Sequence, residues 1–459
     1  MAVIDPARLG LVTTTWQAGR DMMPEYQVQH PRVTNAQLIG VTLGNALEFY
    51  DFLVFSFFAV QIGQCFFPAA SQQTSLLSAL ATFGAGFFMR PLGALVIGGL
   101  GDRLGRRPML MVSFALIGLS TLGVAVTPDY ASIGIAAPVI VILCRLMQGF
   151  ALGGEVGASS AFLAEVAPPS RRGRYVSLQF VGHGLSMLAA GLVGVGLSAV
   201  MDDAALAGWG WRIAMCLGVA IVPIGLALRR TLPETMDADV SAEPAPRLAT
   251  YRGVALFAFL TMLSGTIATY VLGYMTTYAK TVLLLPSGVS FGATVAVGLA
   301  YTFGSIAAGM GSDRFGRRPL MIWPTAIATV LIMPGFWLLS HLPGPATLYS
   351  VSFALRFLLS MATATAFITV TESFPPRVRS GAIAVVYAVA TSVFGGSTQF
   401  VVAWLTGVTG DPLAPAWYML VAALLGLFAM SLARETAPIC VGEKHDEPDA
   451  ARVVGVAIG

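Results

Sequence analysis

Twelve long apolar runs occupy most of the chain, and each is long enough to cross a lipid bilayer as a helix. A transmembrane helix needs about 20 mostly apolar residues, because its backbone polar groups must pair with one another inside the hydrocarbon layer. Only 11% of the residues are charged, against about 25% in a soluble domain. This argues against a water-soluble enzyme, a disordered chain and a nucleic-acid-binding protein. We expect an all-α membrane protein whose twelve transmembrane helices cover 38–62, 76–100, 108–127, 131–163, 175–200, 211–230, 252–280, 288–311, 320–340, 346–373, 381–406 and 414–433.

The arginines of the loops lie in alternate loops between these runs. They follow the second, fourth, sixth, eighth and tenth runs, as Arg103, Arg106, Arg107, Arg171, Arg172, Arg174, Arg229, Arg230, Arg247, Arg252, Arg314, Arg317, Arg318, Arg377 and Arg379. The other loops carry Asp129, Asp202, Asp203, His341 and Asp411, with Lys280 near one boundary. Cytoplasmic loops carry the excess of Arg and Lys, so we expect the basic loops and both termini to be cytoplasmic. The polar stretch before the first run has no apolar core, which predicts a tail and not a cleaved signal peptide.

An internal repeat divides the chain into two halves. Residues 98–108 read GGLGDRLGRRP and residues 309–319 read GMGSDRFGRRP, while EVAPPSRRGR at 165–174 has a counterpart in ESFPPRVRSG at 372–381. Two parallel halves around a central site are typical of transporters that work by alternating access. The predicted parts are a tail (1–35), a six-helix bundle (36–230), a linker (231–250), a second six-helix bundle (251–434) and a tail (435–459).

The duplicated G-x-x-x-D-R-x-G-R-R-P loop resembles the signature of the major facilitator superfamily. Within it, GNALEFYDF (44–52), RPLGALVIGGLGDRLGRRP (90–108), RLMQGFALGGEVG (145–157) and RSGAIAVVYAVATSVFGG (379–396) resemble the metabolite:proton symporter family. The stretches YMTTYAKTVL (274–283) and WLTGVTGDPLAPAWY (404–418) are most similar to its citrate and tricarballylate members. The resemblance covers about residues 35–433. It implies the major facilitator fold, a bacterial inner membrane and a working monomer.

The repeated loop predicts a gate. Asp102 and Asp313 each precede a tight turn, where a carboxylate can cap the positive N-terminal end of a neighbouring helix. The arginines can bridge to the glutamates at the feet of the fourth and tenth helices. The resemblance implies that these bonds form when the cytoplasmic side is closed; the alternative is that the basic loops only set topology. The predicted gate residues are Asp102, Arg106, Glu165, Asp313, Arg317 and Glu372.

Three carboxylates at membrane depth are candidates for proton coupling. Charges inside a membrane are costly and usually functional, and burial disfavours the charged form of a carboxylate. We expect Asp51 to carry the proton, with Glu155 and Glu48 as further candidates. The alternative is that Glu48, Asp51 and Arg90 form a neutralised structural triad.

The arginines at membrane depth indicate an anionic substrate. Arg90, Arg145 and Arg356 bring fixed positive charge into the spans, and a guanidinium group can hold a carboxylate through two hydrogen bonds. The predicted substrate is an organic acid with two or three carboxylates, such as citrate or tricarballylate. His183 and the tyrosines of the seventh run have an alternative role in packing. The predicted substrate-binding residues are Arg90, Arg145, Gln179, His183, Tyr274, Tyr387 and Thr391.

Three other functions share this architecture. One is a symporter for an osmolyte such as proline or betaine, and another is a drug/proton antiporter. Such antiporters usually have a glycine-proline motif in the fifth span, whereas SLQFVGHGLSMLAAGLVGVG (177–196) contains no proline. The third is a sensor that does not transport. The sequence has no nucleotide-binding P-loop and no metal-ligand spacing, so we expect no enzyme activity, cofactor or metal. The expected partners are the organic acid, a proton and the lipid bilayer.

Overall fold

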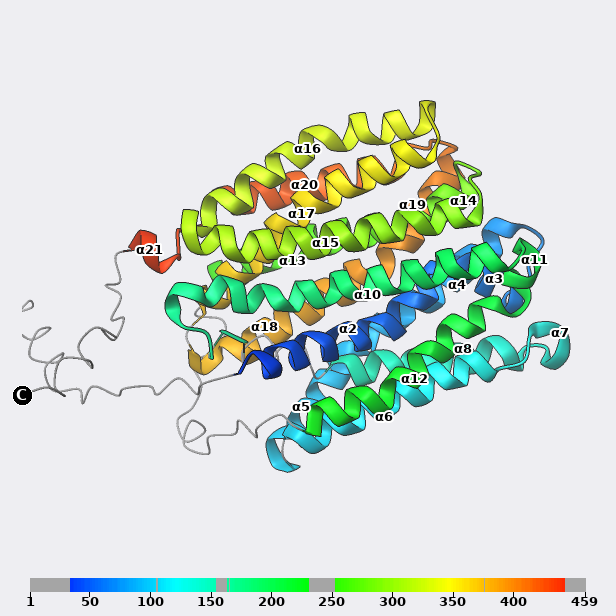
Figure 1. Cartoon of the computed structure of the whole chain (residues 1–459), viewed down its shortest axis with the longest axis horizontal. Helices are drawn as coiled ribbons and strands as arrows, with labels where there is room; N and C mark the ends of the chain where they lie inside the picture. Colours follow the sequence, from blue (N-terminus) through cyan, green and yellow to red (C-terminus); the bar gives the residue numbers. More distant parts are fainter. Residues whose placement is uncertain are drawn as a thin grey trace, which may run out of the picture.

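The computed structural model describes residues 34–104, 106–153, 163–164, 166–230, 252–374 and 376–441. The regular secondary structure of these ranges is entirely helical. Ten of their helical segments are long and apolar enough to cross a membrane, and the apolar segment 111–126 is shorter. Figure 1 shows the long helices running side by side along one axis of the molecule.

The first half of the chain contains the first six predicted spans. The spans are formed by α2 and α3, by α4 and α5, and by α6, α8, α10 and α12. The bounds are α2 (Asn35–Phe57), α3 (Ala59–Phe66), α4 (Gln72–Phe88), α5 (Arg90–Leu104), α6 (Arg106–Val126), α7 (Tyr130–Ile133), α8 (Ala136–Gly153), η1 (Pro169–Arg171), α10 (Arg172–Val200), α11 (Asp203–Ala205), η2 (Leu206–Gly210) and α12 (Trp211–Arg230).

The second half repeats this organisation. Its spans are formed by α13 and α14, by α15, α16 and α17, by α18 with η5 and α19, and by α20. The bounds are α13 (Arg252–Gly273), α14 (Met275–Thr281), α15 (Ser287–Phe315), α16 (Arg317–His341), α17 (Pro345–Ser373), α18 (Pro376–Ala390), η5 (Thr391–Gly395), α19 (Gly396–Thr409), α20 (Ala414–Ser431) and α21 (Pro438–Val441). The prediction of twelve helices in two bundles is confirmed.

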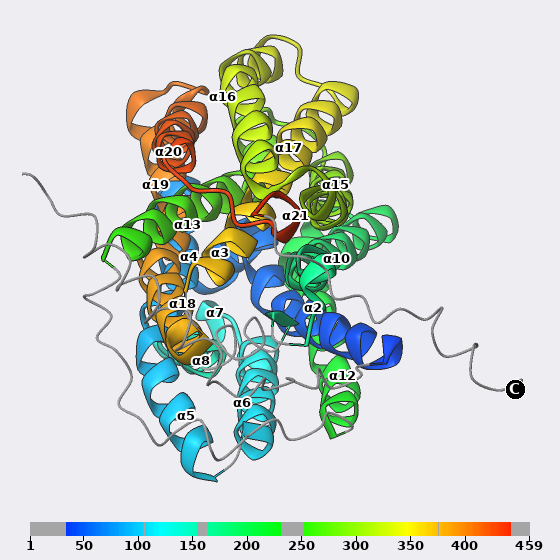
Figure 2. The same cartoon turned by 90° about the vertical axis from the view of Figure 1, so that its left-hand side faces the viewer.

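The two bundles are visible in Figure 2, one above the other. In the first, α2 packs against α10 and α12, and α8 against α4 and α6; in the second, α17 packs against α15 and α16, and α13 against α20. The bundles meet mainly along α10 and α15, and also along α4 and α19. Glycines permit these contacts, since a Cβ added at Gly184 would collide with Thr302 and one at Gly84 with the carbonyl oxygen of Gly396. Close approach through small residues is a common basis of helix packing in membranes.

Local sequence explains where individual helices begin and break. Thr34 starts α2 with a capping box, in which its hydroxyl accepts the Gln37 N–H and the Gln37 side chain accepts the Thr34 N–H. The second span breaks between Phe88 and Arg90, directly before Pro91. Proline cannot donate a backbone hydrogen bond and favours the first turn of a helix, so α5 begins at this point inside the membrane. The break places Arg90 at a helix start.

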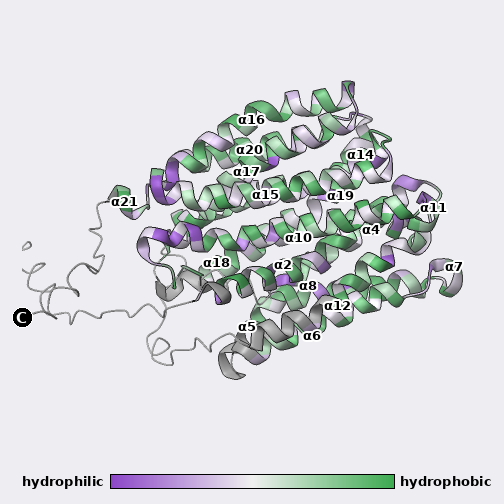
Figure 3. Cartoon of the chain, viewed as in Figure 1, coloured by the Kyte–Doolittle hydropathy of each residue, from purple (hydrophilic) through white to green (hydrophobic). Residues whose placement is uncertain are grey.

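The two ends of the bundle differ in charge. The starts of α10 and α16 and the end of α15 lie at one end together with α21, and hydrophilic residues gather there in Figure 3. We call this the arginine-rich end; α7, α11 and α14 lie at the opposite end (Figure 1). Along the flanks, large apolar side chains such as Leu95, Val330 and Val421 are exposed, as expected of a surface that faces lipid.

Candidate functional site

A cluster of buried polar side chains lies where the two bundles meet. We call it the central cluster; its members are the buried Glu48, Arg90, His183, Tyr270, Tyr301 and Arg356 and the half-buried Tyr387. The first three come from the first bundle and the other four from the second. Electrostatic interactions join members of both bundles, for example Arg90 with Tyr270 and Tyr387, and Arg356 with His183. The cluster therefore connects the two halves of the protein at their centre.

Arg90 enters the cluster from the break in the second span. Its guanidinium carbon lies 4.1 Å from the centroid of the Phe87 ring and 4.7 Å from that of Phe52. Its side chain is only 3% exposed, and its Nε and Nη2 atoms have no hydrogen-bond partner among the described residues. An arginine held by aromatic faces keeps its charge and its donors. Arg90 can therefore donate two hydrogen bonds to an anion.

Arg356 approaches the same cluster from α17. Its guanidinium carbon lies 3.3 Å from the centroid of the Tyr301 ring, and its Nη1 donates to the Thr269 hydroxyl over 3.0 Å. Within the described part of the chain, Nε and Nη2 again lack partners. Two buried arginines with open donor nitrogens, one from each bundle, make the cluster a candidate anion site.

His183 supplies a third group with an open nitrogen. Its ring lies 3.6 Å from the Phe49 ring, centroid to centroid, and meets the Tyr301 ring edge-on at 6.0 Å. Its Nε2 atom has no hydrogen-bond partner in the described ranges. Glu48 is buried nearby and interacts electrostatically with Tyr387. The cluster thus combines cationic, neutral and acidic groups.

Asp51 lies in a second group within the first bundle. We call it the Asp51 cluster, and it consists of Asp51, Arg145, Gln148 and Thr121. Arg145 Nη1 donates to Gln148 Oε1, and Gln148 Nε2 donates to the Thr121 hydroxyl over 3.1 Å. Arg145 is also the charged neighbour of Asp51, whose Oδ1 has no hydrogen-bond partner among the described residues. A buried carboxylate in these surroundings can exist in a charged and a protonated form.

Phe52 lies between the two clusters. The Arg145 guanidinium carbon is 5.6 Å from its ring centroid, compared with 4.7 Å for Arg90. Because Phe52 follows Asp51 on α2, a movement of this turn of the helix changes the surroundings of both arginines. The geometry can therefore couple the charge of Asp51 to the central cluster.

Asp313, near the end of α15, belongs to an ion network of the second bundle and accepts hydrogen bonds from the first bundle. The Asp313 carboxylate accepts the backbone N–H groups of Gly173 and Arg174 over 2.9 and 3.0 Å, which caps the start of α10. Arg317 Nη1 lies 2.8 Å from Asp313 Oδ1, and its Nη2 lies 2.9 Å from Glu372 Oε1. A carboxylate at a helix start is stabilised by the orphan N–H groups there. The network joins the two bundles at the arginine-rich end.

The comparison with known families decides what kind of protein has this architecture. The model of the Major Facilitator Superfamily matches residues 41–397. The chain belongs to the major facilitator superfamily. The expectation of a membrane transporter rather than an enzyme is thereby confirmed, as is its placement as an integral membrane protein.

Curated relatives agree with membership of this superfamily. A citrate-proton symporter of Klebsiella pneumoniae is 36% identical over 85% of this chain and 90% of the relative. An alpha-ketoglutarate permease of Escherichia coli is 34% identical over 86% of this chain and 92% of the relative. A proline/betaine transporter of Salmonella typhimurium is 32% identical over 87% and 83%. The resemblance to metabolite:proton symporters is confirmed by these similarities.

Solved structures have the same fold. The proton:xylose symporter XylE bound to 6-bromo-6-deoxy-D-glucose matches with a TM-score of 0.71 and 20% identity, over 87% of this chain and 96% of that protein. The human organic anion transporter MFSD10 matches with a TM-score of 0.57 and 16% identity, over 86% and 99%. At these identities the likeness shows the fold alone.

The structure of this major facilitator protein brings some predicted site residues together and separates others. Arg90, His183 and Tyr387 lie in the central cluster, whereas Arg145 belongs to the Asp51 cluster. Gln179 is engaged with Asn45 on α2: its Nε2 donates to Asn45 Oδ1 over 3.3 Å, and its backbone oxygen accepts from Asn45 Nδ2 over 2.7 Å.

Tyr274 and Thr391 lie in other surroundings. The neighbours of Tyr274 are Tyr278 and Thr281, near the opposite end of the bundle. The Thr391 hydroxyl donates to the backbone oxygen of Tyr387 over 2.8 Å, within its own helix. No interaction of either side chain with a member of the central cluster other than this helical bond is seen among the described residues.

Several predicted residues lie outside what the structure describes. Glu155 and Glu165 fall in gaps between the described ranges, and the side chains of Asp102 and Arg106 are not described. The predicted gate is thus visible only for Asp313, Arg317 and Glu372, the members from the second half.

Tyr301 and Tyr270 are members of the central cluster that the predicted binding set lacks. Tyr270 is one of the tyrosines of the seventh run, for which packing was the alternative role. Tyr301 stands alone in its apolar run and carries no signal, because aromatic residues commonly fill membrane helices. Arg356, one of the three arginines expected to bring positive charge into the spans, is 1% exposed and packs against the ring of Tyr301. An arginine inside a span is the signal that identifies this part of the site.

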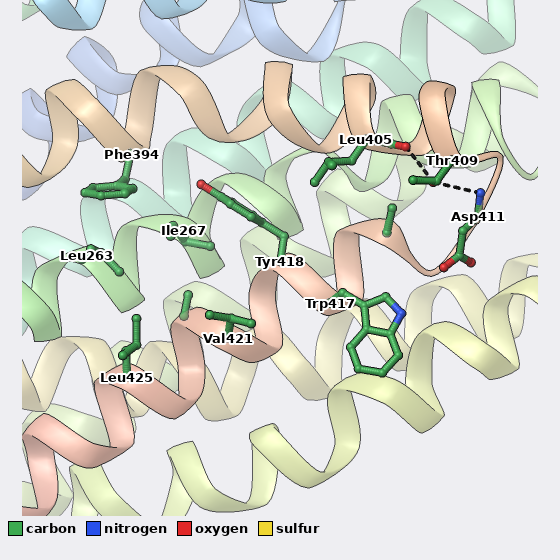
Figure 4. A pocket seen from close by; sticks show the side chains of 12 residues that line it. Leu263, Ile267, Phe394, Leu405, Thr409, Asp411, Trp417, Tyr418, Val421 and Leu425 are labelled. Carbon is green, nitrogen blue, oxygen red and sulfur yellow. Dashed lines mark hydrogen bonds between the residues drawn. The ribbon is translucent and has the colours of Figure 1, made fainter.

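A separate groove of about 540 Å³ lies on the flank of the second bundle, between α13, α19 and α20 (Figure 4). Its lining is apolar except at one end, where Thr409 and Asp411 are found. Trp417 and Val421 line it and are exposed on the outside of α20. Its lining contains no cation, so the groove does not have the chemistry of an anion site and is distinct from the central cluster.

Proposed function

We propose that this protein is a proton-coupled symporter that imports an organic acid with two or three carboxylates, such as citrate or tricarballylate. The observation that carries the proposal is the convergence of Arg90 and Arg356 from opposite bundles. Each presents two guanidinium nitrogens without a partner among the described residues. A polycarboxylate can place one carboxylate on each arginine, with His183 and the tyrosine hydroxyls completing its shell.

This arrangement links substrate binding to movement of the two bundles. In a low-dielectric site, a guanidinium–carboxylate pair is strong because both groups are charged and the geometry is bidentate. A ligand that contacts Arg90 and Arg356 together favours the conformation in which the bundles are close. Alternating access by rocking of the bundles then carries the ligand across the membrane.

The names of the relatives support the same substrate class and also define its main rival. A citrate-proton symporter and an alpha-ketoglutarate permease both carry the name of an organic acid. A proline/betaine transporter is nearly as similar, and the tyrosines of the central cluster could surround the cation of such an osmolyte. A drug/proton antiporter and a sensor remain weaker alternatives, because no relative described above carries such a name.

Asp51 is the proposed proton carrier, with Glu48 and Glu155 as further candidates. When Asp51 is charged, it attracts Arg145; when it binds a proton, that attraction is lost and the turn of α2 that carries Phe52 can shift. This supports a coupling between protonation and the central cluster through Phe52. The loaded carrier would then reorient with a neutral Asp51, which lowers the cost of movement in the membrane.

The proposed location is a bacterial inner membrane, with the arginine-rich end and both termini in the cytoplasm and the monomer as the working unit. The orientation follows from the arginine loops. In this view the two halves are residues 36–230 and 251–434, and the network of Asp313, Arg317 and Glu372 closes the cytoplasmic side. Because the loop motif is duplicated in the first half of the chain, we expect the matching half of the gate to consist of Asp102, Arg106 and Glu165.

Uptake into proteoliposomes tests the proposal. Radiolabelled citrate, tricarballylate and 2-oxoglutarate should accumulate when an inward proton gradient is applied and only equilibrate without it. Citrate or a related polycarboxylate should also raise the melting temperature of the purified protein, and Arg356→Gln should remove this shift. Stabilisation by betaine or proline but by no polycarboxylate would replace the substrate class with an osmolyte.

A further inference from the structure

The segment after the last transmembrane helix is bound to the start of α16. We call residues 432–441 the C-terminal strap. Glu435 Oε1 accepts the backbone N–H of Arg317 over 2.8 Å, and its Oε2 accepts that of Arg318 over 2.9 Å. Both N–H groups belong to the first turn of α16, where a helix has no internal acceptors for them. The strap therefore provides the N-terminal cap of α16 from a part of the chain more than a hundred residues away.

The strap is folded around the same carboxylate. The N–H groups of Thr436 and Ala437 also donate to Glu435 Oε1, over 3.0 and 2.9 Å. The Thr436 hydroxyl donates to Glu372 Oε2 over 2.7 Å. Because Glu372 is also the ion-pair partner of Arg317, the strap holds both members of that pair.

Gly316 makes room for this contact. Its φ is +95°, a value that residues with a side chain rarely adopt, and a Cβ at this position would lie 2.9 Å from Glu435 Oε2 and 3.2 Å from Cys440 Sγ. The turn between Asp313 and Arg317 is thus shaped to receive the strap. This turn connects the end of α15, which carries Asp313, with Arg317 at the start of α16.

The strap also reaches the first bundle. Pro438 and Ile439 of α21 enclose a small cavity of about 180 Å³ together with Pro169, Ser170 and Asp313. This cavity lies beside the bonds from the Gly173 and Arg174 N–H groups to Asp313. The strap therefore contacts both bundles at the point where they are joined.

We propose that Glu435 is a positioning residue of the gate: by capping α16, the C-terminal strap holds Asp313 in place to cap α10, and it must leave α16 before the arginine-rich end can open. The inference rests on the proposed function only in assuming that this end opens during transport. The coupling itself, between Glu435 and the start of α10, is a property of the resting protein.

Hydrogen exchange of the full-length protein in nanodiscs tests this coupling without substrate or a proton gradient. Glu435→Gln loses one acceptor oxygen and directs an NH₂ group toward backbone donors. We expect exchange of the Arg317 and Arg318 amides to rise about tenfold, the factor expected for one charge-assisted hydrogen bond. The Gly173 and Arg174 amides, which do not touch Glu435, should rise with them. Faster exchange at Arg317 and Arg318 with no change at Gly173 and Arg174 would show a local cap and overturn the proposal.

Two further variants make the outcome specific. Thr436→Val removes only the hydroxyl bond to Glu372 and should give a smaller increase at the same four amides; it also serves if Glu435→Gln is poorly folded. Asp129→Asn is the matched control, because Asp129 caps α7 at the opposite end of the molecule. It should leave exchange at the arginine-rich end unchanged, and a change there would show that the effect is global destabilisation. The experiment measures no transport. A wrong symport proposal would therefore leave its result unchanged, and the two proposals are tested separately.

Discussion

The guanidinium group of Arg356 is packed on the ring of Tyr301, with 3.3 Å between the guanidinium carbon and the ring centroid. Both residues belong to the second bundle, and both are buried. Arg356 also acts electrostatically on His183 of the first bundle, and its Nε and Nη2 have no hydrogen-bond partner within the described ranges. A cation–π contact keeps the charge in place without neutralising it, which is the property required for binding an anion.

Arg356→Gln should raise the KM for the transported polycarboxylate by about tenfold or more, since a charge-assisted hydrogen bond contributes about 1.5–3 kcal/mol. Initial rates of uptake into proteoliposomes measure this effect. Arg314→Gln is the control, because Arg314 also lies over a ring, that of Phe315, but is exposed at the arginine-rich end. An unchanged KM in Arg356→Gln would exclude Arg356 from the substrate site.

Asp51→Asn should abolish accumulation driven by the proton gradient, because asparagine cannot bind and release a proton. Exchange of labelled for unlabelled substrate should persist, since it does not require a net proton movement. Both reactions can be followed in the same proteoliposomes. Asp203→Asn is the control, because it removes a carboxylate at the end of the molecule opposite the arginine-rich end and should leave accumulation unchanged. If Asp51→Asn still concentrates substrate against a gradient, another carboxylate carries the proton.

Gly218→Ala should destabilise the protein by about 1–3 kcal/mol, the usual range for overpacking a filled interior. Gly218 on α12 faces Asp51, and an added Cβ would collide with Asp51 Oδ1. Thermal unfolding of the purified protein measures the loss. Gly40→Ala on α2 is the control, because its added Cβ meets no atom within 4 Å. Equal melting temperatures for the two variants would contradict the close packing of α12 on Asp51.

Asp313→Asn should leave the protein folded but slow transport about tenfold, because the cap of α10 and the bond to Arg317 are both weakened when the charge is lost. The maximal rate at saturating substrate measures the change, and a melting curve checks folding. Wild-type uptake by a well-folded Asp313→Asn protein would reject the gate role and leave topology as the function of the loop.

Glu435 predicts a dependence of stability on pH. Burial raises its pKa, but hydrogen bonds from the backbone N–H groups of Ala437, Arg317, Arg318 and Thr436 outweigh burial and hold the pKa below the ordinary value. A lowered pKa in the folded state means that the stabilisation is complete above the unfolded value of about 4.3. It is lost as the pH falls through the folded value.

The melting temperature of Glu435→Gln should therefore lie below that of the wild type at pH 7, and the difference should shrink as the pH falls below about 4. Thermal unfolding of both proteins over this pH range provides the measurement. A difference that is independent of pH would mean that the charge of Glu435 does not contribute.

The positions of the spans and the arginine loops could be predicted because each depends on a local property of the chain. A run such as 288–311 is apolar enough to be a membrane helix wherever its neighbours lie, and α15 occupies that range. The cap that Asp313 provides for a neighbouring helix was also predictable, since a carboxylate before a turn has few other partners. The repeat and the motifs led to the superfamily, which the family model confirms.

Which residues come together in the binding site could not be predicted from such local properties. Arg90 and Arg145 lie in runs of similar composition, yet Arg90 reaches the central cluster and Arg145 the Asp51 cluster. Arg90 follows the break before Pro91 whereas Arg145 lies within α8, and helical periodicity alone does not specify which neighbour a face will meet. Gln179 has the chemistry of a ligand group but is engaged with Asn45.

By itself, the sequence determined the class of this protein, its twelve helices, its duplication and the kinds of charge placed in the membrane. These follow from hydrophobicity, residue order and motif, which are properties of single segments. Only the tertiary structure decided that Arg90 and Arg356 approach His183 from opposite bundles, that Phe52 lies between Arg90 and Arg145, and that Glu435 caps α16. Such contacts join residues that are far apart in the chain, and they depend on how whole helices pack against one another.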